Sequence, residues 1–300
     1  MEYSFPKYLL SKRTVDDRAL NKNVYARLHR LLPEGRPVKI TEIGAGIGTM
    51  LARLIEWGLL ARVDYTAIDE SGENIAYARE WLPRWGRNHG FKVVESDEAL
   101  RLYDDRRDIR LYLVAANGFD FIQSRPARAG LLIAHALLDL LPLPGSLPQL
   151  FSLVEHGGLA WLTLNFDGAT IFEPEIDSEF DEQMVALYHR TMDERQTGGK
   201  PSGDSRTGRH LFTHLRQAGA EILETGASDW VVFPHMVGYP AHEAYFLHFI
   251  LHFFESALAG HPALNQRRLA DWLAARHAQI ESGELVYLAH QLDFLVRVKN

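Results

Sequence analysis

The fold of this chain is decided by the stretch Lys39-Ile40-Thr41-Glu42-Ile43-Gly44-Ala45-Gly46-Ile47-Gly48-Thr49-Met50. A short apolar run ends at an acid, three glycines then alternate with small residues, and an amphipathic helix begins. Glycine is needed where the backbone takes a positive φ or where a ligand touches the main chain. The stretch therefore predicts a strand, a tight ligand-binding turn and a helix.

Outward from this turn, apolar strand-like segments alternate with helical ones. We expect strands at 38–43, 63–68, 109–115, 130–134 and 159–165, and helices at 47–57, 71–81 and 147–154. The third strand has a rival at 91–95, but 109–115 is favoured because the turn Asn117-Gly118-Phe119 follows it. This alternation predicts an α/β, doubly wound, mainly parallel sheet with helices on both faces.

The remaining segments are expected to decorate a single domain. A helix at 14–32 belongs to an N-terminal cap over 1–36, and 38–165 forms the ligand-binding half. After Phe166 the rhythm breaks, so 166–208, with a helix at 183–195, is interpreted as a lid or substrate-side insertion. The part 209–300 is expected to complete the sheet with 209–219 as a helix, strands at 221–224, 230–233 and 285–298, and a helical insertion over 241–281.

Composition excludes several classes of function. The chain has 300 residues, a net charge of −7 and no cysteine, which excludes disulfides, thiolate zinc sites and cysteine nucleophiles. A nucleic-acid partner is not expected, because its footprint would be basic. No apolar signal core or membrane span is visible in the sequence, so the expected location is the cytoplasm and no membrane partner is expected.

The glycine spacing separates two kinds of nucleotide site. A dinucleotide fingerprint needs its third glycine one place later than Gly48, as G-x-G-x-x-G. Glu42 would repel a pyrophosphate but attract an ammonium group. The spacing therefore disfavours an NAD-dependent oxidoreductase and favours an amino-acid-bearing nucleoside.

On these residues the chain resembles the class I S-adenosylmethionine-dependent methyltransferases. Their loop has the form acid-x-G-x-G-x-G, matched by Glu42, Gly44, Gly46 and Gly48, with Ala45 inside it. The resemblance implies S-adenosylmethionine as cofactor, S-adenosylhomocysteine as product, and a seven-stranded sheet whose last strand is antiparallel. It also implies that Asp69, with Glu70 beside it, binds the ribose hydroxyls.

The resemblance assigns roles to two further loops. The adenine amine is expected at Asn117 or, with the other strand choice, at Asp97, and Gly118 and Phe119 are expected beside the ring. The family usually has aspartate there, so Asn117 is a departure. The loop after the fourth strand, which faces the methyl group, matches His135 and Asp139. His135 is the candidate catalytic base, although many members need only alignment of the reacting atoms.

Two basic segments are candidates for contacts with ligands. The loop 202–210 presents Arg206 and Arg209, which together with Asp139 are candidate substrate-binding residues or belong to a solvated hinge. Lys12-Arg13 is expected to be solvated rather than closed over the cofactor carboxylate.

Other histidines and aromatics are given structural interpretations. The pairs His210/His214 and His248/His252 have i,i+4 spacing but no identified third ligand, so no metal is expected and solvated helix faces are favoured. Four phenylalanines on one predicted helix are interpreted as core or a partner surface: Phe246, Phe249, Phe253 and Phe254.

The sequence hypothesis is a methyltransferase acting on an O or N atom of a small-molecule acceptor. The alternative is a protein of the same fold that binds the cofactor or a partner without catalysis.

Overall fold

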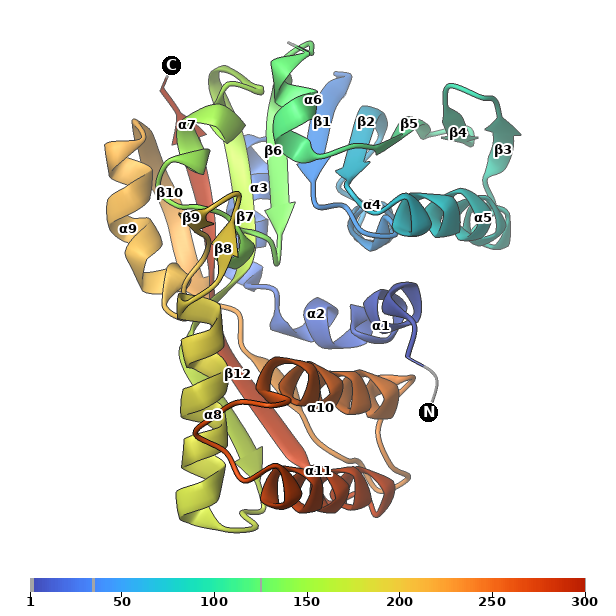
Figure 1. Cartoon of the computed structure of the whole chain (residues 1–300). Helices are drawn as coiled ribbons and strands as arrows, with labels where there is room; N and C mark the ends of the chain where they lie inside the picture. Colours follow the sequence, from blue (N-terminus) through green and yellow to red (C-terminus); the bar gives the residue numbers. More distant parts are fainter. Residues whose placement is uncertain (1–2, 34–35, 125, 300) are drawn as a thin grey trace.

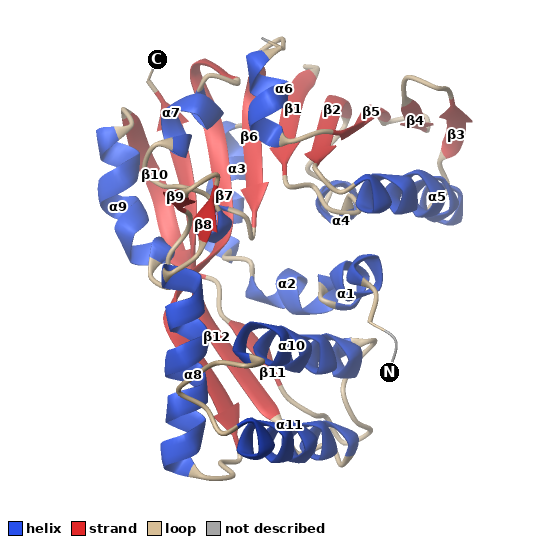
Figure 2. Ribbon diagram, in the orientation of Figure 1, coloured by secondary structure: helices blue, strands red, loops and turns tan. Residues whose placement is uncertain are grey.

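A single ten-stranded sheet runs through the molecule (Figures 1 and 2). The computed structural model describes residues 3–33, 36–124 and 126–299, so the parts of the predicted segments at residues 1, 2, 34, 35, 125 and 300 lie outside the described residues. Along the sheet the strand order is β10-β12-β7-β6-β1-β2-β5-β4-β3, and β11 pairs with β12. All other structural elements are arranged around this sheet.

The central strands are parallel, and β12 near one edge of the sheet runs antiparallel to them. β5 (Asp108–Ala115), β2 (Arg62–Asp69), β1 (Val38–Ile43), β6 (Ala129–His135) and β7 (Val154–Glu173) pair in parallel in that order. β12 (Val286–Val298) then runs antiparallel between β7 and β10 (Ala220–Ala227). These strands confirm the predicted doubly wound α/β class and the choice of the third parallel strand.

The prediction of seven strands was too low. A hairpin of β3 (Lys92–Glu95) and β4 (Leu100–Tyr103) adds to the edge beside β5, and the short β11 (Trp230–Val232) adds to β12. The segment considered as a rival third strand is therefore the outer strand of an antiparallel hairpin.

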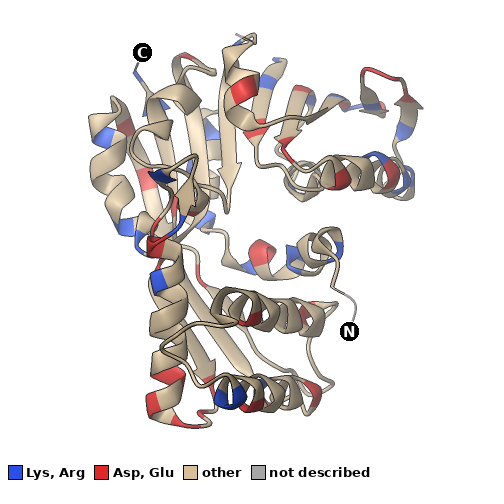
Figure 3. Cartoon of the chain, in the orientation of Figure 1, with Lys and Arg blue, Asp and Glu red and all other residues tan. Residues whose placement is uncertain are grey.

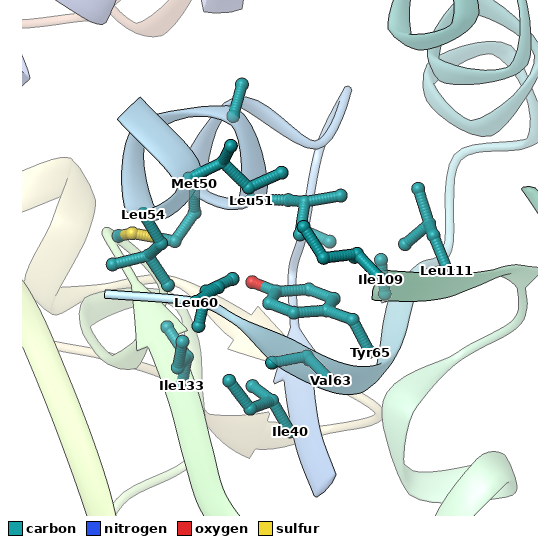
Figure 4. Packing of buried hydrophobic residues seen from close by; sticks show 14 of the residues in the cluster. Ile40, Met50, Leu51, Leu54, Leu60, Val63, Tyr65, Ile109, Leu111 and Ile133 are labelled. Atoms are coloured by element: carbon teal, nitrogen blue, oxygen red, sulfur yellow. The ribbon is translucent and has the colours of Figure 1, made fainter. Parts of the chain in front are cut away.

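Helices cover both faces of the sheet over separate apolar cores. On one face lie α3 (Lys22–Leu31), α4 (Thr49–Glu56) and α5 (Gly72–Asn88), whose apolar side chains pack on β1, β2 and β5. Figure 4 shows Tyr65 and Val63 of β2 among Met50, Leu51 and Leu54 of α4. On the other face lie α6 (Gly118–Gln123), α7 (Ser146–Phe151) and α9 (Thr207–Gln217).

The strands β7 and β12 extend past the doubly wound part and form the base of a second lobe (Figure 1). This extension is covered by α8 (Ser178–Asp193), α10 (Glu243–Leu258) and α11 (Gln266–Glu281), which share an aromatic-rich core with it. Phe246, Phe249 and Phe254 belong to this core, as the sequence suggested. The helices α1 (Phe5–Ser11) and α2 (Arg13–Ala19) lie between the two lobes.

Several predicted element boundaries were wrong. The strand expected to end at Asn165 continues to Glu173, because its distal part pairs with β12. The single helix expected at 14–32 is divided between α2 and α3, because Asn21 caps a new helix by accepting hydrogen bonds from the amides of Asn23 and Val24. Within the helical insertion predicted over 241–281, α11 begins only after the cap Asn265.

Two short elements fill the remaining connections near the sheet. A 3-10 turn, η1 (Leu138–Leu140), follows β6, and a small hairpin of β8 (Gln196–Thr197) and β9 (Lys200–Pro201) follows α8. Lys and Arg are interspersed with Asp and Glu over the chain (Figure 3). Among the described residues, no helix combines the length and the apolar character that a membrane crossing requires.

Candidate active site

A cavity of about 590 Å³ lies where β1, β2, β5 and β6 end. This is the crevice in which open α/β sheets bind ligands, and the volume is in the range of small-molecule sites, about 300–1,000 Å³. Most of the residues predicted for the cofactor line it: Glu42, Gly44, Ala45, Gly46, Asp69, Glu70, Asn117, Gly118, Phe119 and His135. Gly48, Asp139, Arg206 and Arg209 are not part of its lining.

The glycine turn has the conformation that its sequence predicts. Gly44, Gly46 and Gly48 have φ values of 71°, 56° and 79°, a region that other residues rarely adopt. A Cβ at Gly44 would lie 2.9 Å from Leu137, and one at Gly46 would lie 2.8 Å from Leu9. Glycine is therefore needed both for the turn and for the close approach of the two leucine side chains over it.

Asp69 ties the second strand to the glycine turn. Its Oδ2 accepts a hydrogen bond of 2.7 Å from the amide of Gly46. Its Oδ1 accepts from the amide of Ser71 and from Nδ2 of Asn74, both at 3.0 Å. A carboxylate has about four acceptor positions, so one remains on Oδ2 for a ligand. Glu70, which also lines the cavity, offers further acceptor capacity beside it.

Glu42 is a buried carboxyl at the base of the turn. Its side chain accepts a 2.7 Å hydrogen bond from the hydroxyl of Tyr65, and the residue is only 1% exposed. Burial raises the pKa of Glu42 to about 8, against the opposing effects of the Tyr65 hydrogen bond and Arg53. Such a carboxyl becomes ionised readily only when a positive group enters the cavity beside it.

Lys12 is a cavity residue, which the sequence interpretation missed. The expectation of a solvated lysine was wrong: Lys12 is 6% exposed, and its Nζ lies 3.3 Å from Oδ2 of Asp16. The neighbouring Arg13 points elsewhere and pairs with Glu56. The reason is tertiary, because α1 and α2 bring Lys12 over the sheet ends, where it also lies 5.3 Å from the ring of Trp230.

His135, at the end of β6, has partners at both ring nitrogens. Nδ1 lies 2.8 Å from the hydroxyl oxygen of Thr163 and Nε2 lies 3.0 Å from Oδ2 of Asp16. Burial lowers the pKa of His135 to about 4, so the ring is neutral at pH 7. Its one N–H donates from Nε2 to the carboxylate, and Nδ1 accepts from Thr163. In this arrangement neither nitrogen is free to receive a proton.

Asn117, the residue expected to contact the adenine amine, is the N-cap of α6. Its Oδ1 accepts a hydrogen bond from the amide of Phe119, and its Nδ2 donates to Glu70 at 3.3 Å. The alternative, Asp97, lies in the turn between β3 and β4 and does not line the cavity. Close packing explains Gly118, where a Cβ would lie 2.9 Å from Ile43.

The three candidate substrate residues are distributed differently. Asp139 lies in η1, between the cavity-lining residues Leu137 and Leu140. Arg209 donates from Nε to Asp167 at 2.9 Å, and Arg206 is exposed at the start of α9. The structure therefore keeps Asp139 beside the cavity and gives one of the two arginines a carboxylate partner outside it.

The cavity also includes residues that no local pattern indicated. Its outer wall combines α1, the loop around η1 and the β8–β9 hairpin: Phe5, Leu9, Leu137, Leu140, Leu141, Pro142, Thr197 and Lys200. Apolar residues in helices and loops are normally interpreted as core, so their role here follows only from the way the chain folds.

The histidine pairs do not form a metal centre in the described part of the chain, where no three His, Cys, Asp or Glu side chains gather suitably. The expectation of a solvated helix face was wrong for His248. This residue is 7% exposed, and its Nδ1 lies 2.7 Å from Nδ1 of His277 on α11.

No protein-family model and no curated protein matches the chain significantly. Solved structures are similar at the level of the backbone. An S-adenosylmethionine-dependent methyltransferase from Thiobacillus denitrificans, in complex with S-adenosylhomocysteine, aligns over 100% of both chains with a TM-score of 0.48 and 12% identity. One from Geobacter sulfurreducens, also with S-adenosylhomocysteine, has a TM-score of 0.43 and 12% identity over 98% of this chain and 99% of the other. YjhP from E. coli has a TM-score of 0.44 and 12% identity over 99% and 100%.

The sheet itself defines the class of fold. Five neighbouring strands of the sheet, β5, β2, β1, β6 and β7, are parallel. The strand that comes last in the sequence, β12, is antiparallel and lies between β7 and β10, which is the arrangement that the resemblance implied. The chain therefore has the class I methyltransferase fold, enlarged by the β3–β4 hairpin and the second lobe.

Proposed function

We propose that this protein is an S-adenosylmethionine-dependent methyltransferase that methylates an O or N atom of a small-molecule acceptor. One observation carries the proposal: the positive-φ glycine turn, the buried Glu42 and the partly satisfied Asp69 all line one cavity at the ends of β1 and β2. The cofactor supplies a methyl group on a positively charged sulfur.

The charges of the cavity fit the two ends of this cofactor. Glu42 would bind the amino group, because an ammonium beside it favours the ionised carboxylate. Lys12 would bind the cofactor carboxylate, since this residue lines the cavity and its Nζ is already oriented by Asp16. Asp69 and Glu70 would accept from the ribose hydroxyls, and Asn117 and Phe119 would contact the base.

The chain's contribution to the reaction would be alignment and exclusion of water. A transfer of this kind requires the nucleophile, the methyl carbon and the sulfur to lie in line, and positioning alone supplies a large part of the rate. Leu9, Leu137 and Leu140 provide apolar walls at the glycine turn. His135 would orient Asp16 and Thr163 rather than remove a proton, because both of its ring nitrogens are occupied.

Calorimetric titration with S-adenosylmethionine and S-adenosylhomocysteine tests the proposal. We expect micromolar affinity for both, and at least about a tenfold loss in Asp69→Asn, because a hydrogen bond to a charged group contributes about 1.5–3 kcal/mol. Asp64→Asn is the matched control on the same strand, away from the cavity lining, and should bind normally.

Absence of binding heat with both ligands would end the proposal. Tight binding of NADH instead would favour an oxidoreductase. Binding without turnover on any acceptor panel, followed as release of S-adenosylhomocysteine, would favour the non-catalytic alternative.

A further inference from the structure

The two ends of the cofactor cavity differ in charge. At the strand ends the lining includes three acids, Glu42, Asp69 and Glu70, which the proposed function assigns to the cofactor. The outer wall that α1, the loop around η1 and the β8–β9 hairpin form is mostly apolar. Among the described residues of this outer wall, Lys200 is the one with a charged side chain.

Two leucines join the outer wall to the glycine turn. Leu9 on α1 approaches the turn at Gly46, and Leu137 approaches it at Gly44. A Cβ added to these glycines would lie 2.8 Å and 2.9 Å from the respective leucine side chains. α1 and the loop that leads into η1 therefore both pack against the glycine turn, and the cavity continues outward along them.

Beyond these leucines, each wall carries a large apolar side chain that is open to solvent. Phe5 precedes Leu9 by four residues, so the two lie on the same side of α1. In the 3-10 turn, the amide of Leu140 donates to the carbonyl of Leu137 at 2.9 Å. Phe5 is 43% exposed and Leu140 is 44% exposed, although both line the cavity. Exposed apolar side chains that gather at a cavity are typical of a ligand-binding surface.

Lys200 reaches the same end of the cavity from a third element. Thr197 pairs with Lys200 across the two-residue turn of the β8–β9 hairpin, and the hydroxyl of Thr197 donates to that of Ser202 at 2.9 Å. The amide of Gly203 then donates to the carbonyl of Leu141 at 2.6 Å. The backbone that carries Lys200 is therefore fixed beside η1.

The charge of Lys200 is available to a ligand. Among the described residues it has no acidic partner, whereas Lys12, the other lysine of the lining, is held by Asp16 at 3.3 Å. An ammonium group beside an apolar wall complements a ligand that has an apolar body and an acid group. One lysine matches the single negative charge of a carboxylate better than a phosphate monoester, which carries about two at pH 7.

We infer that the acceptor is an apolar small molecule with a carboxylate, which Lys200 binds while Phe5 and Leu140 pack against the apolar body. This inference rests on the proposed function. The carboxylate is an anchor and not the methylated atom, because Lys200 belongs to the outer wall whereas the residues assigned to the cofactor lie at the strand ends. The O or N atom that receives the methyl group is at the other end of the acceptor, toward the glycine turn.

Calorimetry on protein saturated with S-adenosylhomocysteine tests the inference with probes of matched shape: 3-phenylpropionate against 3-phenylpropionamide, and octanoate against octanamide. We expect each carboxylate to bind about fivefold more tightly than its amide at low salt. The preference should shrink at high salt, because Lys200 is exposed and its charge is screened.

Variants of the lysine separate its charge from the rest of the site. Lys200→Gln should remove the preference for carboxylates and leave the affinity for S-adenosylhomocysteine within about twofold, whereas Lys200→Arg should keep the preference. Lys92→Gln, at an exposed position of β3 outside the cavity lining, makes the same charge change as a control. Phe5→Ala should weaken the carboxylate and the amide of each pair by the same factor, because it removes apolar contact only.

Equal binding of carboxylates and amides, failure of all four probes to bind, or a preference that survives Lys200→Gln would overturn the inference. Tighter binding of 2-phenylethyl phosphate than of 3-phenylpropionate would overturn the choice of a carboxylate. A loss of about tenfold or more in the affinity of Lys200→Gln for S-adenosylhomocysteine would overturn it by assigning the lysine to the cofactor. Failure of S-adenosylhomocysteine to bind the wild-type protein would instead refute the proposed function.

Discussion

At the scale of single residues, Glu42 combines a structural cost with a proposed binding role. Its pKa is raised to about 8 by burial, from an ordinary value of 4.5. Because the folded state favours the protonated form, Glu42 destabilises the fold increasingly as the pH rises from 4.5 to 8. We therefore predict that Glu42→Gln unfolds with a free energy higher by on the order of 2–3 kcal/mol at pH 7.

The same variant should bind S-adenosylmethionine at least about tenfold more weakly, because the ammonium loses its carboxylate. Urea denaturation and calorimetry measure the two effects. Glutamine still accepts from Tyr65, and Tyr65→Phe shows how much that hydrogen bond contributes. A variant that is more stable and binds normally would contradict the role assigned to Glu42.

The effect of His135 on the stability of the fold should depend on pH in the direction opposite to that of Glu42. Its pKa falls from 6.5 to about 4 on burial, so protonation favours the unfolded chain. Stability is fully present above pH 6.5 and is lost as the pH falls toward 4. Between pH 7 and pH 5, the free energy of unfolding of the wild-type protein should therefore fall by on the order of 2 kcal/mol more than that of His135→Gln.

Denaturant titrations at several pH values measure this difference. His29→Gln, at an exposed position of α3, is the control and should show no such effect. Asp16, whose pKa is lowered by Lys12 and His135, titrates below this range and does not obscure it. Parallel curves for the wild type and His135→Gln would show that folding does not lower the pKa of the ring.

At the scale of elements, the β8–β9 hairpin and the loop after it are fixed against η1 through Gly203. Gly203 has a φ of 72°, and a Cβ there would overlap the carbonyl oxygen of Asp139. Gly198, in the same hairpin, has a φ of 59° with open space around it. Alanine at Gly198 should therefore cost about 1 kcal/mol from backbone strain alone.

Gly203→Ala should lower the free energy of unfolding several-fold more than Gly198→Ala does, because η1 or the hairpin must move to make room for the Cβ. Thermal unfolding of the two variants gives the comparison. Equal losses would mean that the loop carrying Gly203 is free to move away from η1.

The elements differ in how far the sequence predicts them, and the reason is the range of the interactions that form them. The turn at Gly44 and the strands β1 and β2 were predicted because their glycines and apolar alternation act locally. The distal part of β7 was not, because Asp167-Gly168 and the acidic residues that follow resemble a loop. They form a strand only through pairing with β12, more than a hundred residues later: Thr170 with Ala289, and Glu173 with Val286.

At the scale of the whole molecule, the site depends on contacts between distant segments. The sequence predicted most of the cavity-lining residues at the strand ends, from Glu42 to His135, because each follows a recognisable strand. It did not identify Lys12, Phe5 and Leu9, because a cationic or apolar side chain in a helix carries no sign of what lies opposite. Their place in the cavity follows from α1 and α2, which pack between the lobes.

Asp16 connects these parts, and its removal provides a test of the connection. It is 1% exposed and accepts hydrogen bonds from Nε2 of His135 on β6 and from Nε1 of Trp230 on β11, at 3.0 Å each. It also pairs with Lys12 and, at 3.7 Å, with the buried Arg53 of α4. One carboxylate thus joins α2, the cofactor cavity and the second lobe.

We predict that Asp16→Asn lowers the free energy of unfolding by about 3–5 kcal/mol, because it leaves buried cations without their counter-charge. Since β7 and β12 run through both lobes, the variant should still unfold in one transition in calorimetry. Its melting temperature should be lower than that of the wild type by on the order of 10 °C. Asp17→Asn is the control: this carboxylate pairs with Arg53 from a position that is 29% exposed, and its loss should cost less than half as much. A weaker affinity for S-adenosylmethionine in Asp16→Asn, with the wild-type melting temperature, would instead confine the role of Asp16 to the orientation of Lys12.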